Sequence, residues 1–311
     1  MSIEIKKNLV RAVTESAIHA AWIQWGALGS RVTAARPARS MVDPEALVLL
    51  SLALRDHERR LWDVLAAWAA AGPTFLSVQR IKNLGASYPE RTAQRLAEFA
   101  RIAVHEGGDH RWRTLAGARS GPPRRAQSLA RTGAGEWPTA ALLPRLRLGI
   151  GVGLHADVLA FLLAQQGAWA SARQIADATG YTVYAIRRTA DRMAEARLIE
   201  STARKPVEFR ADASAWSGVL GVQEQVVPWG HWHQAYAFIA ELVALADDGQ
   251  LTAPTPYLLS SRLRDLVSKH RDAFRLNRLA SPEPGRFPGE EFLPAFEEFA
   301  EAFAAWMRDG A

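Results

Sequence analysis

Cysteine does not occur among the 311 residues of this sequence. Its absence excludes disulfide bonds, thiolate metal sites and cysteine nucleophiles, and it is compatible with a reducing compartment. Long apolar runs are lacking as well, because none approaches the roughly 20 residues of a membrane-spanning helix. Residues 1–8 (MSIEIKKN) carry charge where a signal peptide needs an apolar segment. We therefore expect a cytoplasmic protein that makes no contact with a membrane.

Motifs of common catalytic and nucleotide-binding sites are also missing. The sequence contains no G-x-x-x-x-G-K-[ST], no G-x-S-x-G and no H-E-x-x-H, and no G-x-G-x-x-G follows a predicted strand. His231 and His233 are two residues apart, so on a helix they point in different directions, and no cysteine supplies a third metal ligand. We expect no catalytic residues, no metal and no cofactor.

Positive charge is present in excess and is unevenly distributed. The formal net charge is +6, which is compatible with a polyanionic partner. Residues 101–147 contain nine arginines and three acidic residues, a net charge of +6, whereas residues 281–311 contain two arginines and seven acidic residues. This distribution predicts that the middle of the chain meets a polyanion and that the C-terminal part does not.

Apolar residues recur at spacings of three and four almost everywhere, so we predict a mostly α fold with small β-wings. The clearest pattern is a helix over 155–166, a second over 171–178, a turn at Thr179-Gly180 and a third over 182–196. Two short alternating segments follow around the basic turn 203–206, as in a β-hairpin. This order of elements is typical of a winged helix-turn-helix.

A weaker copy of the pattern precedes it. Residues 77–84 and 89–101 read as two helices joined at Gly85, and residues 102–114 read as a small hairpin. Residues 91–98 (RTAQRLAE) and 188–195 (RTADRMAE) are similar, and both an internal duplication and a chance similarity remain open. We predict tandem winged helix-turn-helix domains plus a C-terminal helical module.

The sequence thus divides into five segments. They are N-terminal helices for dimerisation or packing (1–55), a degenerate winged helix (56–116), a basic linker (117–150), a winged helix-turn-helix DNA-binding domain (151–215) and a C-terminal helical dimerisation or sensor module (216–311).

The third helix of a winged helix carries the predicted DNA contacts, because an α-helix fits the major groove and side chains near its N-terminus reach base edges. Arg187 is expected to bind guanine, and Thr182 and Tyr184 to meet phosphates or a thymine methyl group. The basic turn is placed to enter a minor groove or to bind a phosphate. The alternative is that these residues form only a solvated helix face and turn. The predicted contacts are Ser171, Arg173, Thr182, Tyr184, Arg187, Arg188, Arg204 and Lys205.

Further cations lie in the first unit and in the linker. The first unit could equally be a packing or dimer module, but its cations and those of the linker would add salt-sensitive attraction if they lay beside DNA. The candidates for phosphate contacts are Arg80, Lys82, Arg91, Arg95, Arg124 and Arg125.

Residues 155–211 resemble the winged helix domains of bacterial transcription regulators of the MarR and ArsR type. The resemblance rests on Ser171 to Ala176 (SARQIA), Gly180, the pair Arg187-Arg188 and the pair Arg204-Lys205. It covers under a fifth of the chain, and the flanking helices do not match the dimerisation helices of those families. The resemblance implies binding of double-stranded DNA, usually as a homodimer on a palindromic site.

Three hypotheses of function follow. The first is a sequence-specific transcription regulator, nucleoid-associated when bound, that reads the major groove with helix 182–196 and uses the wing 203–206. The second is an antitoxin or other protein-interaction module that regulates its own operon and has a protein partner. The third is a helical ribonuclease, because Arg264-Asp265 followed by His270 resembles the motif of HEPN ribonucleases.

Overall fold

The computed structural model describes residues 3–30, 36–71, 74–117, 137–220, 226–252, 255–283 and 285–311. These residues are mostly helical and contain one small three-stranded sheet. None of the helices in these ranges is long and apolar enough to cross a membrane. Two hydrophobic cores organise the described residues.

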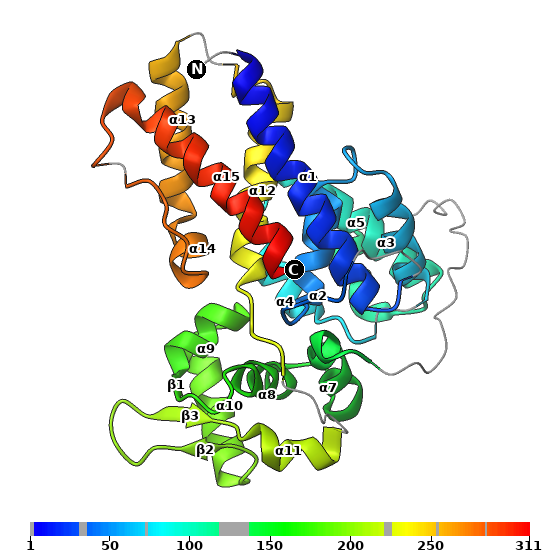
Figure 1. Cartoon of the computed structure of the whole chain (residues 1–311). Coiled ribbons are helices and arrows are strands. Elements are labelled where there is room, and N and C mark those ends of the chain that lie inside the picture. Colours follow the sequence, from blue (N-terminus) through cyan, green and yellow to red (C-terminus); the bar gives the residue numbers. More distant parts are fainter. Residues whose placement is uncertain are drawn as a thin grey trace.

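The larger core belongs to a group of helices that we call the helical body. It is formed by α1 (Ile3–Ala27), α2 (Pro44–Ala53), α3 (Arg60–Ala70), α4 (Val78–Gly85), α5 (Glu90–His105), η1 (His110–Trp112), α6 (Arg113–Ala116), α12 (Trp232–Asp247), α13 (Pro256–Lys269), α14 (Arg271–Leu276), η3 (Gly289–Glu291) and α15 (Phe292–Gly310). Helix α1 packs along α15, and α12 packs against α2 (Figure 1). The N-terminal and C-terminal helices therefore share one core, whereas the sequence predicted separate modules.

The smaller core belongs to the winged unit. This unit comprises α7 (Leu142–Ile150), α8 (Leu154–Ala164), β1 (Ala170–Ser171), α9 (Ala172–Thr179), α10 (Val183–Glu195), β2 (Glu200–Ser201), β3 (Glu208–Arg210) and α11 (Ala213–Leu220). The short η2 (Thr139–Ala141) precedes it and packs in the larger core. Strand β3 lies between β1 and β2 and is antiparallel to both. In the chain this unit lies between α6 and α12, so it interrupts the helical body (Figure 1).

The predicted hairpin over residues 102–114 is wrong. Residues 102–105 are the last turn of α5, and residues 110–116 form η1 and α6. Ile102 and Ala103 are buried and continue the apolar face that includes Phe99, so helical packing outweighs the local strand-like pattern. Asp109 caps η1 by accepting a hydrogen bond from the Arg111 N–H. Helices α4 and α5 are present, but the described part of the first unit has no wing.

The predicted linker over 117–150 is partly wrong. Residues 139–150 form η2 and α7. Ala140 and Ala141 of η2 join the larger core, whereas the buried leucines of α7 join the core of the winged unit. Residues 118–136 lie outside the described part of the chain.

Gly180 forms the turn between α9 and α10. Its φ of +75° is the left-handed conformation that glycine adopts without strain. A Cβ atom built at this position would lie 2.6 Å from Cδ2 of Leu84 in α4. The turn of the winged unit therefore packs directly on the helical body. Glycine suits its left-handed conformation, and a larger residue there would also require the Leu84 side chain to move.

Replacing Gly180 with alanine is expected to lower the free energy of unfolding by about 1–2 kcal/mol, because a side chain is strained in the left-handed region. Urea unfolding would measure the change. Gly149→Ala is the control, since a Cβ atom there would have no neighbour within 4 Å. Equal effects of the two substitutions would contradict this prediction.

Candidate nucleic-acid interface

The two helices of the candidate interface are each capped at the N-terminus by a hydroxyl side chain. Ser171 caps α9 in a capping box: its Oγ accepts a hydrogen bond from the Gln174 N–H, and the Gln174 side chain accepts one from the Ser171 N–H. Thr182 caps α10, and its Oγ1 accepts from the Ala185 N–H at 3.3 Å. Such caps satisfy N–H groups that lack partners inside the helix. Both residues predicted as DNA contacts thus also fix where the helices begin.

Helix α10 separates an apolar inner face from a basic outer face. Ile186, Ala190 and Met193 are buried on the inner face. The exposed side chains are those of Thr182, Tyr184, Arg187, Arg188, Asp191, Arg192 and Glu195, and Tyr184 is 75% exposed. Neither Arg187 nor Arg188 has an ion pair or side-chain hydrogen bond with another described residue. Their guanidinium groups are therefore available to a partner.

The wing is present where the sequence predicted it. Thr202 shapes the turn, because its Oγ1 accepts from the Glu208 N–H at 3.0 Å and donates to the Arg204 backbone oxygen at 3.3 Å. Arg204 and Lys205 are exposed at the tip between β2 and β3. The turn projects beyond the sheet (Figure 1).

Three further cations of this surface were missed by the sequence analysis. Arg192 is exposed on α10, and its position four residues after Arg188, on the same helix face, could have indicated this. Arg197 is exposed after the end of the helix. Arg210 in β3 lies over the Trp169 ring, 4.6 Å from the ring centre, and pairs with Glu200 at 2.6 Å. No local pattern in the sequence pairs Arg210 with Trp169.

Arg173, a predicted DNA contact, is exposed on α9 and pairs with Asp177 one turn later at 3.1 Å. Its charge is partly compensated, in contrast with the charges of Arg187 and Arg188.

The predicted phosphate contacts of Arg80 and Arg95 are wrong. Arg80 is 0% exposed. Arg95 is also buried, donates to the backbone oxygens of Leu52 and Ala53 at 2.8 and 3.1 Å, and pairs with Asp56. Both arginines stabilise the helical body and cannot reach DNA.

The remaining predicted phosphate contacts differ in their surroundings. Arg91 pairs with Asp247 at 2.8 Å, within the helical body. Lys82 is half-buried on α4, and its phosphate contact stays a prediction. Arg124 and Arg125 lie outside the described residues.

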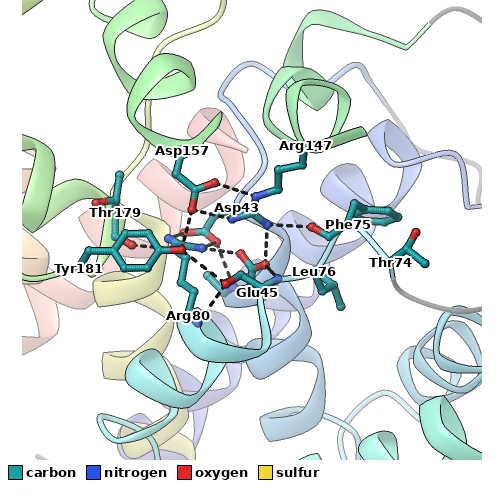
Figure 2. A network of polar contacts seen from close by, with 12 residues as sticks. Asp43, Glu45, Thr74, Phe75, Leu76, Arg80, Arg147, Asp157, Thr179 and Tyr181 are labelled. Carbon is teal, nitrogen blue, oxygen red and sulfur yellow. Dashed lines mark hydrogen bonds and ion pairs between the residues drawn. The ribbon is translucent and has the colours of Figure 1, made fainter. Parts of the chain in front are cut away.

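A buried ion network joins the helical body to the winged unit (Figure 2). Arg80 of α4 pairs with Asp43 and Glu45 at 2.5 and 2.7 Å. Arg147 of α7 pairs with Glu45 and Asp157 at 2.5 and 2.7 Å. All five side chains are at most 2% exposed. Asp43, Glu45 and Arg80 belong to the body, and the other two belong to the winged unit.

The network also holds the turn that precedes α10. Arg80 Nε donates to the backbone oxygen of Thr179 at 2.6 Å, and the Tyr181 hydroxyl donates to Asp157 at 3.0 Å. The Gln234 side chain of α12 donates to the backbone oxygen of Asp177 at 2.7 Å. The C-terminal end of α9 is thus fixed to the body from two sides.

Electrostatics keep this network charged. Burial alone would raise the pKa of Asp43, but the charge and hydrogen bonds of Arg80 lower it to about 2. Burial alone would lower the pKa values of Arg80 and Arg147, but the neighbouring carboxylates raise both above the ordinary value. Burial and the charge of Asp157 raise the pKa of Tyr181, so its hydroxyl keeps its proton and can donate.

Arg264 and His270 of the ribonuclease hypothesis do not share a site. Arg264 donates to the backbone oxygens of Phe287 and Gly289 at 3.0 and 3.1 Å. His270 is buried and hydrogen-bonds to Glu241 at 2.7 Å. These contacts stabilise the packing of α13, and they do not bring the two side chains to a common partner.

His231 and His233 lie at the start of α12 and are both largely buried. Within the described ranges, no three histidine or acidic side chains are grouped so that they could hold a metal ion.

Comparison with known proteins gives one match. No curated protein and no solved structure matches the chain significantly. A model described as MarR family matches residues 149–206. This range runs from the end of α7 through α10 and β2 into the wing. The resemblance predicted from the sequence is therefore confirmed, and residues 149–206 form a MarR-like winged helix.

Proposed function

We propose that the protein is a sequence-specific DNA-binding transcription regulator. The observation that carries the proposal is the pair Arg187 and Arg188, exposed and without ionic partners among the described residues, on the third helix of a MarR-like segment. Unpaired guanidinium groups on such a helix are suited to guanine edges and phosphates in the major groove. MarR-like domains are typical of transcription regulators, so DNA in the cytoplasm is the proposed partner.

The proposed contacts follow from the positions of the side chains. The N-terminal half of α10 enters the major groove, with Arg187 on a guanine and Tyr184 on a phosphate or a thymine methyl group. Arg204 and Lys205 of the wing contact the adjacent minor groove or its phosphates. The family resemblance implies a homodimer on a palindromic site, so we expect two chains per duplex.

Replacing Arg187 with alanine is expected to weaken binding to the specific duplex about tenfold, because a bidentate contact to guanine contributes about 1–3 kcal/mol. Fluorescence anisotropy with full-length protein and a duplex from upstream of its own gene would measure this loss. Affinity for a scrambled duplex should change much less, since non-specific binding depends mainly on phosphates.

Arg59→Ala is the matched control, because Arg59 is exposed on the helical body, before α3. The proposal fails if the wild-type protein binds neither duplex, or binds both equally. It also fails if both alanine variants bind like the wild type.

A further inference from the structure

A second exposed cluster of positive charge lies in the C-terminal half of the chain. Residues 261–280 contain six arginine or lysine residues and two acidic residues, a net charge of +4. Three of the cations are committed to the body: Arg262 donates to the Gln250 backbone oxygen, Arg264 to backbone oxygens, and Lys269 to Glu241. The other three cations are exposed.

These three cations lie on α14 and directly after its end. Arg271, Arg275 and Arg278 are four and then three residues apart, on α14 and just beyond it. The spacing of Arg271 and Arg275 places both on one face of α14, and Arg278 follows the end of the helix with a φ of +56°. We call these three residues the α14 basic ridge. Arg275 pairs with Asp272 at 2.9 Å. Arg271 and Arg278 have no ion pair or side-chain hydrogen bond with another described residue, so their charges are uncompensated.

The ridge is held close to the helix-turn-helix through the start of α12. The Asn277 side chain accepts from the His231 N–H at 3.0 Å and donates to the His231 backbone oxygen at 3.3 Å. One turn later, Gln234 donates to the backbone oxygen of Asp177 in α9. Helices α14 and α9 are therefore tied to the same end of α12, with the orange α14 above the green α9 in Figure 1.

The position of α9 indicates which part of a bound DNA would lie near the α14 basic ridge. In helix-turn-helix proteins the helix before the recognition helix crosses the DNA backbone. The end of α9 at Asp177 is the end tied to the body, so a DNA backbone that α9 crosses near this end would have α14 beside it. We propose that the α14 basic ridge contacts phosphates of the DNA that flanks the site held by the winged unit. This inference rests on the proposed function.

These phosphate contacts would make a predictable contribution to the salt dependence of DNA binding. Each neutralised phosphate changes the slope of log K against log salt by about 0.9, independently of base sequence. Arg271 and Arg278 together should therefore account for a slope of about 1.8. Their contribution to affinity should shrink about tenfold between roughly 50 and 200 mM salt.

The test is the double variant Arg271→Ala/Arg278→Ala in the full-length protein. Binding would be titrated by anisotropy at several salt concentrations, with a duplex of the minimal binding site and with one extended by about one helical turn, about 10 base pairs, on each side. With the extended duplex, we expect the salt slope of the variant to be lower by about 1.8. With the minimal duplex, the slopes of the variant and the wild type should agree.

The control is Arg59→Ala/Arg286→Ala, which removes two exposed arginines elsewhere on the body and should leave both slopes unchanged. If the wild type binds DNA but the ridge variant keeps the wild-type slope on both duplexes, the inference is overturned and the proposed function stands. An equal loss on both duplexes with a lowered thermal midpoint also overturns it, because the ridge would then be structural. If the wild type binds neither duplex, both proposals fail.

Discussion

Replacing Arg80 with methionine is expected to destabilise the protein by about 3–5 kcal/mol, because removing one partner of a buried ion pair leaves uncompensated charge. Arg80 is fully buried and makes two hydrogen bonds to Asp43 and one to Glu45. Without it, Asp43 keeps the Ala46 N–H as a hydrogen-bond donor but loses both guanidinium contacts. Urea unfolding at pH 7 would measure the change as a lower midpoint.

Two further variants separate this effect from general damage to α4. Lys82→Met alters a half-buried cation of the same helix that has no ion pair with a described residue, and it should cost about 0.5 kcal/mol or less. Asp43→Asn/Arg80→Met removes charge from both partners and should recover part of the loss. A loss below about 1 kcal/mol for Arg80→Met would show that the network is not a main support of the junction.

Acidification is expected to destabilise the protein through His231 and His233. Burial lowers the pKa of His233 to about 3, with the charge of Arg80 adding to the effect and Asp43 opposing it. Burial and the charge of Arg275 lower the pKa of His231 to about 4. The unfolded chain binds these protons near pH 6.5, so stability present above that pH is lost progressively as the pH falls toward 3.

Between pH 6.5 and the pKa that each histidine has in the folded protein, each should lower the free energy of unfolding by about 1.4 kcal/mol for every pH unit of acidification. Urea unfolding at pH 6.5 and pH 4 would show the loss, and His233→Gln should reduce it by about 3 kcal/mol. His155→Gln is the control, because His155 is exposed on α8. An equal pH dependence in His233→Gln and the wild type would contradict this assignment.

The winged unit could be predicted from the sequence because its signals are local. Ser171 and Thr182 cap their helices, and Gly180 occupies the left-handed turn between them. Each of these residues acts on partners within four positions in the chain, where sequence patterns are informative. The exposed face of α10 follows from the same periodicity.

The burial of Arg80 could not be predicted, because its partners are distant in the chain. Asp43 and Glu45 lie 37 and 35 residues before it, and Thr179 lies 99 residues after it. An arginine in a helical pattern looks the same whether it faces DNA or a buried carboxylate. The pairing of α1 with α15 is of the same kind, since no local pattern links segments at opposite ends of the described chain.

The interruption of the helical body by the winged unit has a consequence for synthesis on the ribosome. All five residues of the buried ion network precede α12 in the chain, so the junction can close while α12 to α15 are still being made. Until those helices emerge, the apolar faces of α1 and α2 that they cover remain open to solvent. A nascent chain that stalls after the wing would thus carry a complete winged unit on an unfinished body, and its open apolar faces would be prone to aggregation and to capture by chaperones.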